Sequence, residues 1–272
     1  SATCGLPEGY SPQGFITDWL LLGPYAQAGG AEPPAAEIQR DYLTDGASIN
    51  EIDAEPEAGD TVNTDYGGAA ASTGLVATPG RPGLNPGGVP TWTLHQDPDD
   101  TIDFQDYYGG DLDDLMMYAV VYLDVPEDIV VDIGLASDDS IQVLLDGTEI
   151  HLNSIARGVN TSNQVDDIVS STIVPELNPL TAGKHKLVVK VFEGVQGNGF
   201  RLRFQDAVGA PALVGKVSTS PLEGGGPTFF RADANGDKTV NITDGIFVLN
   251  FLFLGGPPPP CKAAADPNDD NQ

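Results

Sequence analysis

Residues 141–152 read Ile-Gln-Val-Leu-Leu-Asp-Gly-Thr-Glu-Ile-His-Leu, and this stretch decides the fold class. Two apolar runs flank Asp146-Gly147, a dipeptide that readily adopts the positive φ angles of a tight two-residue hairpin turn. The stretch therefore predicts two antiparallel strands, at 141–146 and 148–152, joined by that turn.

Short apolar segments bounded by Asp, Gly, Pro or Asn continue on both sides of this hairpin. Residues 15–22 form one such run, a buried strand that Gly23-Pro24 is expected to close. So many short strands separated by turn signals favour a mainly β fold, a sandwich of the jelly-roll type. The remaining predicted strands are 91–95, 101–107, 115–124, 129–136, 186–193 and 199–206.

The composition changes twice along the chain, which suggests its domain organisation. Residues 1–206 are predicted to form the sandwich, with a short helix at 36–45 and a long surface excursion at 46–90 that is rich in Gly, Pro, Ala and Asp. Residues 207–229 are predicted to be a linker. Residues 230–272 form a second segment, with an apolar helix from Ile246 to Leu254, a strut of four prolines and an acidic tail.

The charge balance excludes several classes of partner. The 272 residues carry 40 acidic against 12 basic side chains, a formal net charge of −28. Phosphate backbones and anionic lipids would be repelled, so neither nucleic acid nor a membrane surface is expected as a partner. The sequence has no apolar run of about 18 residues, so membrane insertion is not expected either. Such a chain should instead collect cations.

Residues 233–244 have the ligand spacing of an EF-hand type calcium loop. Oxygen-bearing side chains stand at loop positions 1, 3, 5, 9 and 12, and position 7 would offer its backbone carbonyl, as calcium prefers six to eight hard oxygen ligands. Position 6 is lysine rather than the usual glycine, and position 12 is aspartate rather than glutamate. The alternative is an ordinary acidic turn before a helix. The six predicted ligands are Asp233, Asn235, Asp237, Thr239, Asn241 and Asp244.

This loop and the helix after it, at about 231–256, resemble the type I dockerin repeat, which also closes its loop with aspartate. Dockerins carry two repeats, and residues 265–270 restart the pattern, so that Asp266, Asn268 and Asp270 would occupy positions 1, 3 and 5 of a second loop. Gln272, the last residue of the sequence, stands at position 7 of that loop. The resemblance implies calcium as cofactor and docking to a partner, either a cohesin-like protein or another copy of this chain.

A second resemblance covers residues 115–206. The segments Ala136-Ser137-Asp138-Asp139-Ser140, Leu145-Asp146-Gly147 and Gly197-Asn198-Gly199-Phe200 are similar to galactose-binding-like sandwiches and to the protective-antigen-like sandwich of flocculin-type lectins. In the latter, paired aspartates hold calcium beside a sugar, which implies the same role for Asp138 and Asp139. The alternative is that both carboxylates only accept backbone N–H groups in a turn. Trp19 and Trp92 lie in apolar runs and are expected in the core.

Two further features bear on the setting of the protein. Cys4 and Cys261 would form a disulfide joining the two ends, remain separate thiols, or bridge neighbouring chains. Asn160 begins a glycosylation sequon in a polar loop. The chain starts with Ser1 rather than Met, as a processed secreted protein would, so an extracellular or cell-surface location is expected.

Catalysis is not expected. His95, His151 and His185 show no metal-binding spacing, and the sequence contains no nucleophile elbow. The sequence therefore favours a secreted, non-catalytic structural protein that assembles through its calcium-dependent tail, such as a filament subunit. The alternative is a carbohydrate-binding module of a secreted polysaccharide-degrading system.

Overall fold

The computed structural model describes residues 9–27, 29–43, 51–60, 91–97, 99–108, 113–159, 165–211, 218–220, 234–235 and 241–256. The chain divides into two compact units, Gly9–Glu223 and a smaller unit formed by Ser1–Glu8 with Gly224–Gln272. Cys4, Cys261, Asn160, Asp266, Asn268 and Asp270 lie outside the described residues, as do Asp233, Asp237 and Thr239.

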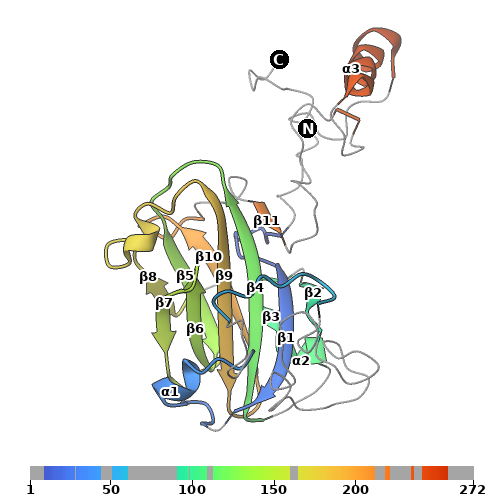
Figure 1. The fold of residues 1–272 in the computed structure, drawn as a ribbon. Helices are drawn as coiled ribbons and strands as arrows, with labels where there is room; N and C mark the ends of the chain where they lie inside the picture. Colours follow the sequence, from blue (N-terminus) through green and yellow to red (C-terminus); the bar gives the residue numbers. More distant parts are fainter. Residues whose placement is uncertain are drawn as a thin grey trace. The chain divides into compact units, whose positions relative to one another are not determined.

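The larger unit is mainly β, as predicted, and its strands form two antiparallel sheets (Figure 1). In chain order, the described elements are β1 (Asp18–Ala26), α1 (Ala35–Ile38), β2 (Thr93–Gln96), β3 (Ile102–Asp103), α2 (Phe104–Tyr108), β4 (Leu115–Val125), β5 (Asp132–Asp138), β6 (Ser140–Leu145), β7 (Thr148–Asn153), β8 (Asp167–Val169), the 3₁₀ helix η2 (Pro175–Leu177), β9 (Gly183–Glu193), β10 (Gly199–Gln205) and β11 (Ser218–Ser220).

The large sheet has the strand order β2-β1-β4-β9-β6-β7, and β11 pairs with β4 beyond the end of β1. The small sheet has the order β3-β10-β5-β8. The predicted hairpin is confirmed: β6 and β7 are joined by Asp146-Gly147, whose φ angles are 49° and 82°. These angles match a turn of the type that the right-handed twist of paired strands favours.

The large sheet is buried on both of its faces, which explains why β4 is almost continuously apolar. Alternate β4 residues beginning with Leu115 belong to the core between the two sheets. The other set, from Met116 to Tyr122, packs on the opposite face against Trp92, Ala54 and the segment 38–43. Trp19 and Trp92 are both buried, which confirms their predicted place in the core.

Residues 51–60 cover this outer face, so this part of the predicted surface excursion is packed. Ala54 is buried, and a side chain at Gly147 would come within 2.3 Å of the Ile52 side chain. The close approach explains why the hairpin turn needs glycine for space as well as for its φ angle.

Two local predictions are wrong. Residues 101–107 do not form one strand, because Asp103 accepts the backbone N–H groups of Gln105 and Asp106 and starts helix α2. This is the side-chain cap that favours a helix start over an extended chain. Strand β1 also continues past Gly23-Pro24, with a shift of register between Leu22 and Tyr25 where the predicted turn would be.

The smaller unit contributes one described helix, α3 (Ile242–Leu254), which begins four residues earlier than predicted. Asn241 caps its start by accepting the Thr243 N–H at 2.7 Å, and Gly255 ends it with φ of 73°. None of the helices in the described part of the chain has the length and apolar character needed to span a bilayer.

Candidate functional site

One end of the small sheet brings together aspartates from β3 and β5, the two strands that flank β10. Gly199 on β10 pairs with Asp103 on β3 and with Asp138 on β5, so the two aspartates flank a residue without a side chain. Gly197 lies directly against the Asp138 side chain, since a Cβ atom at position 197 would be 2.2 Å from the Asp138 carboxylate. A Cβ atom at Gly199 would likewise lie 2.4 Å from the backbone oxygen of Ile102, so both glycines permit close packing beside a space that the aspartates line.

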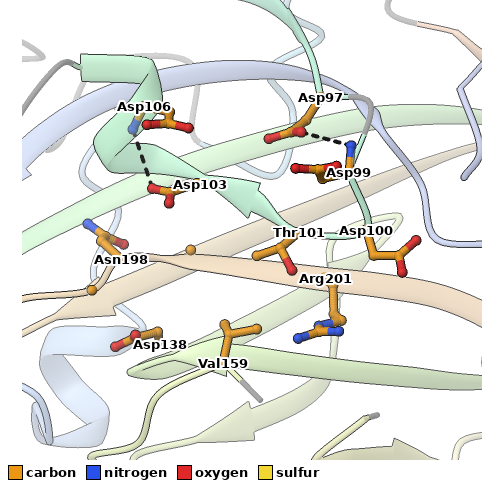
Figure 2. Close-up of a pocket in the computed structure, with 12 residues that line it drawn as sticks. Asp97, Asp99, Asp100, Thr101, Asp103, Asp106, Asp138, Val159, Asn198 and Arg201 are labelled. Atoms are coloured by element: carbon orange, nitrogen blue, oxygen red, sulfur yellow. Dashed lines mark hydrogen bonds between the residues drawn. The ribbon is translucent and has the colours of Figure 1, made fainter. Parts of the chain in front are cut away.

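This space is an acidic pocket of about 480 Å³ (Figure 2). We call it the aspartate pocket. Its lining contains six aspartates and one cationic side chain, Arg201, so its formal charge is strongly negative. The lining residues are Asp97, Asp99, Asp100, Thr101, Asp103, Asp106, Asp138, Val159, Gly197, Asn198, Gly199 and Arg201.

Asn198 presents an unsatisfied oxygen in this pocket. Its amide nitrogen donates to the hydroxyl of Tyr108 at 3.0 Å, which fixes the orientation of the side chain. Its Oδ1 atom is buried and has no hydrogen-bond partner in the described part of the chain. A buried acceptor without a partner costs about 1 to 3 kcal/mol, so a bound cation or hydroxyl would stabilise this arrangement.

Arg201 is the pocket's second unsatisfied group. Only 2% of the residue is exposed, and its Nε atom has no hydrogen-bond partner among the described residues. Its place on the pocket wall offers a charged donor to a ligand oxygen (Figure 2). The site thus combines many carboxylate oxygens with one charged donor.

The structure separates the roles of the two adjacent aspartates, which are joined by a cis peptide bond. Asp139 does not line the pocket: its oxygens accept the N–H groups of Arg157 at 2.8 Å and Gly194 at 3.0 Å. Asp139 therefore has the alternative role given above, in which the carboxylate only accepts backbone N–H groups in a turn. Asp138 does line the pocket. Burial, together with the charge of Asp139, raises the pKa of Asp138 to about 6.

A polar cluster on the neighbouring strands holds the loop that carries Arg157. Oδ2 of Asp167 accepts the Arg157 guanidinium at 2.8 Å and the Asn153 amide at 2.8 Å, and lies 3.1 Å from His151 Nε2. Arg157 also donates to Ser137 at 2.8 Å. The cluster fixes Arg157, whose backbone N–H in turn holds Asp139.

No three acidic, histidine or cysteine side chains converge closely enough to hold a metal ion among the residues that the structure describes. An ion beside Asp138 would therefore need amide or backbone oxygens, and further oxygens from water or from a ligand. Asn198 Oδ1 is the described protein oxygen best suited to this, because it is buried and unpaired.

The remaining predicted ligands belong to the smaller unit. Asp244 is buried, and its two oxygens accept the backbone N–H groups of Asn241 at 2.8 Å and Asn235 at 3.2 Å. The Asn235 amide also donates to Thr243 Oγ1 at 3.2 Å. These three predicted ligands therefore lie together at the start of α3, where they hold the helix cap.

Sequence reasoning missed most of the aspartate pocket. Asp97, Asp99 and Asp100 fall in one short run, and Asn198 stands in a Gly-Asn-Gly segment that reads as a plain turn. The only sequence feature that could have indicated the pocket is that the chain contains both this pair of glycines and the run of aspartates. Only knowledge of the strand order β3-β10-β5 brings the two segments together.

No family model matches the sequence, and no curated protein matches it. Among solved structures, the chain is similar to an anti-sigma factor domain-containing protein at 13% identity and a TM-score of 0.33, with 48% of this chain and 44% of that chain covered. It is also similar to the PA14 domain of the MpAFP antifreeze protein, at 14% identity, a TM-score of 0.33 and coverage of 81% and 94%.

A third similar structure is the PA14 sugar-binding domain from an RTX adhesin, at 11% identity and a TM-score of 0.31, with 72% of this chain and 94% of that chain covered. The similarity to these PA14 sandwiches is distant.

Proposed function

We propose that the larger unit binds carbohydrate through a divalent cation, with calcium the expected ion, held in the aspartate pocket. The observation that carries this proposal is the buried, unpaired Asn198 Oδ1 in the same pocket as Asp138. Carboxylate and amide oxygens are the ligands that calcium prefers. Asp139 stabilises the site indirectly, because it accepts the backbone N–H groups of Arg157 and Gly194 in the two segments beside Asp138.

A sugar fits the pocket better than an ion alone. The volume of about 480 Å³ is many times that of one cation, and few protein oxygens are in place to complete the coordination of calcium. Neighbouring hydroxyl groups of a sugar would supply those oxygens. They would also offer donors to the surrounding carboxylates and an acceptor to Arg201, so a hydroxyl-rich ligand matches the polar wall.

The test is a titration of the full chain with a panel of methyl glycosides and short oligosaccharides, in calcium and in EDTA. We expect binding only with calcium, and loss of at least tenfold in affinity for Asp138→Asn. Asp124→Asn is the matched control, because it removes the same charge from an exposed position outside the pocket. Absence of binding to every sugar in calcium would contradict the proposal.

A second candidate function rests on Asp244, whose carboxylate ties Asn235 to the start of α3. Here the dockerin-like segment closes around calcium and docks to a cohesin-like protein or to another copy of this chain. Exposed apolar residues at helical spacing on α3, from Ile242 through Ile246 and Leu249 to Phe253, would supply the docking surface.

This second function makes the chain a secreted, non-catalytic assembly subunit, and both functions are compatible in one molecule. Light scattering of the full chain after size exclusion, in calcium and in EDTA, tests self-association. We expect assembly in calcium alone. A monomer in both conditions would leave a cohesin-like partner as the only form of the proposal, and failure to bind immobilised cohesins would then exclude it.

A further inference from the structure

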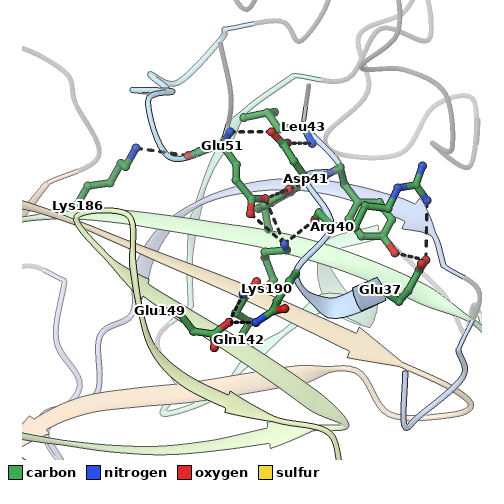
Figure 3. Close-up of polar contacts among 12 residues, drawn as sticks. Glu37, Arg40, Asp41, Leu43, Glu51, Gln142, Glu149, Lys186 and Lys190 are labelled. Atoms are coloured by element: carbon green, nitrogen blue, oxygen red, sulfur yellow. Dashed lines mark hydrogen bonds and ion pairs between the residues drawn. The ribbon is translucent and has the colours of Figure 1, made fainter. Parts of the chain in front are cut away.

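The outer face of the large sheet contains a buried lysine and a buried carboxylate in direct contact, outside the aspartate pocket (Figure 3). Lys190 on β9 is completely buried, and Glu51 comes from the segment that covers the sheet. The Lys190 Nζ atom lies 3.2 Å from each of the two Glu51 carboxylate oxygens. The nitrogen is therefore equidistant from the two carboxylate oxygens.

Aromatic rings and a few polar groups surround this pair, and the charges of Asp41 and Glu149 also act on Lys190. The rings of Tyr118 and Tyr42 lie 5.7 and 5.9 Å from the Lys190 nitrogen. Burial lowers the pKa of Lys190, although the charge of Glu51 opposes the effect. Burial likewise raises the pKa of Glu51, against the influence of Lys190. Both directions shift the pair toward the neutral amine and the neutral acid.

Tyr118 is placed to activate the carboxyl group. Its hydroxyl donates to Glu51 Oε2 at 2.5 Å, and burial keeps the pKa of this phenol well above its ordinary value, so that the proton stays on the oxygen. A donor at this oxygen withdraws electron density from the carboxyl carbon and stabilises negative charge that develops on the oxygen when that carbon is attacked.

We propose that Lys190 and Glu51 condense to an intramolecular amide bond that links β9 covalently to residue 51. Proton transfer from the ammonium group to the carboxylate gives the amine and the acid. The nitrogen then attacks Cδ of Glu51, the bond from Cδ to one oxygen breaks, and that oxygen leaves as water with a proton from the nitrogen. The reaction needs no oxidant and no further reactant. Tyr118 acts as the catalytic donor.

A neighbouring lysine gives a matched comparison. Lys186 also lies on β9 and also reaches the covering segment, but its Nζ atom donates to the backbone carbonyls of Ile52 at 2.5 Å and Ala54 at 2.6 Å. These carbonyls belong to backbone amides, which are poor electrophiles. Lys190 also donates to one backbone carbonyl, that of Arg40 at 2.7 Å, but its nitrogen in addition contacts the carboxyl group of Glu51.

The test is the intact mass of the purified full chain, measured after denaturation and reduction. We expect a mass lower than that of the sequence by one water, and a fragment spectrum in which the peptides containing residues 51 and 190 are joined. The fragment spectrum is essential, because cyclisation at Asp146-Gly147 would also remove one water. Reduction excludes any contribution from a disulfide.

Lys190→Arg keeps the charge but cannot form this amide, and should show the full mass, whereas Lys186→Arg should still lack one water. Tyr118→Phe should slow the reaction, which would appear as a mixture of linked and unlinked chains. The full sequence mass in folded wild-type protein, or water loss located elsewhere, would overturn the proposal. The wild-type measurement decides even if every variant fails to fold.

Discussion

Gly197 and Gly158 both lie near the carboxylate of Asp138, yet only Gly197 is tightly constrained. A Cβ atom at Gly197 would lie 2.2 Å from Asp138 Oδ2, whereas one at Gly158 would lie 3.6 Å from the same oxygen. The first distance is far below van der Waals contact, and the second is ordinary contact. The Asp138 side chain would have to turn away to accommodate a methyl group at position 197.

We therefore expect Gly197→Ala to weaken calcium binding by the larger unit about tenfold or more, which corresponds to about 1.4 kcal/mol. Gly158→Ala should bind calcium nearly as the wild type does. Isothermal titration with calcium measures both. Equal affinities of the two variants would show that Asp138 is not a ligand in the aspartate pocket.

The raised pKa of Asp138 gives a pH dependence whose sign can be worked out. Its value of about 6 in the folded protein exceeds the ordinary value of 3.8, so between these pH values the folded state retains a proton that the unfolded state has lost. The free energy of unfolding of the calcium-free protein should therefore fall as pH rises through this window. The full shift corresponds to about 3 kcal/mol at most, before solvent screening reduces it.

Urea unfolding in EDTA at pH 5 and pH 7 measures this effect. Asp138→Asn should lose less stability between the two pH values than the wild type, because it has no proton to release. Calcium should also remove the difference in the wild type, since the ion binds the carboxylate form. An unchanged pH dependence in the variant would assign the effect to another group, such as Asp139, whose pKa burial also raises.

At the scale of elements, the sequence predicts strands best where one pattern dominates. The hairpin of β6 and β7 was predictable because Asp146-Gly147 specifies its turn, and β4 because both of its faces are apolar. The start of α2 was not predictable, because Asp103 caps the helix from within a partly apolar segment whose sequence resembles a strand. Of the residues that line the aspartate pocket, only Asp138 was predicted as a ligand, because local sequence patterns do not determine the order of strands in a sheet. The jelly-roll connectivity stays a prediction.

Helix α3 offers a test of the dockerin-like segment at the level of one element. Asp244 accepts backbone N–H groups of both Asn241 and Asn235, so Asp244→Ala removes the reciprocal cap and one predicted calcium ligand. Loss of such a cap costs about 1 kcal/mol. We expect lower helix content by far-ultraviolet circular dichroism, in EDTA and in calcium alike.

Asp244→Asn separates the two roles of this side chain. It keeps an oxygen that accepts one N–H but removes the negative charge that calcium requires. We expect it to retain most of the helix in EDTA and to lose the gain that calcium produces in the wild type. Identical calcium responses of the wild type and this variant would show that the segment at 233–244 is an ordinary acidic turn.

At the scale of the whole molecule, the net charge of −28 destabilises the folded chain through repulsion among its acids. Any salt reduces this repulsion, because the screening length falls to about 10 Å at 0.1 M ionic strength. Specific sites behave differently, since an ion that binds only the folded state stabilises it according to its own affinity. The aspartate pocket and the loop at 233–244 are the two places where we expect such binding.

Thermal unfolding therefore has to compare calcium with potassium chloride at equal ionic strength. We expect millimolar calcium to raise the melting temperature well beyond the effect of potassium, and this excess to shrink in Asp138→Asn and Asp244→Asn. The two reductions should add in the double variant, because the residues belong to separate compact units. If calcium and potassium were equivalent, the acidity of this chain would be general surface charge, and both proposed ion sites would have to be abandoned.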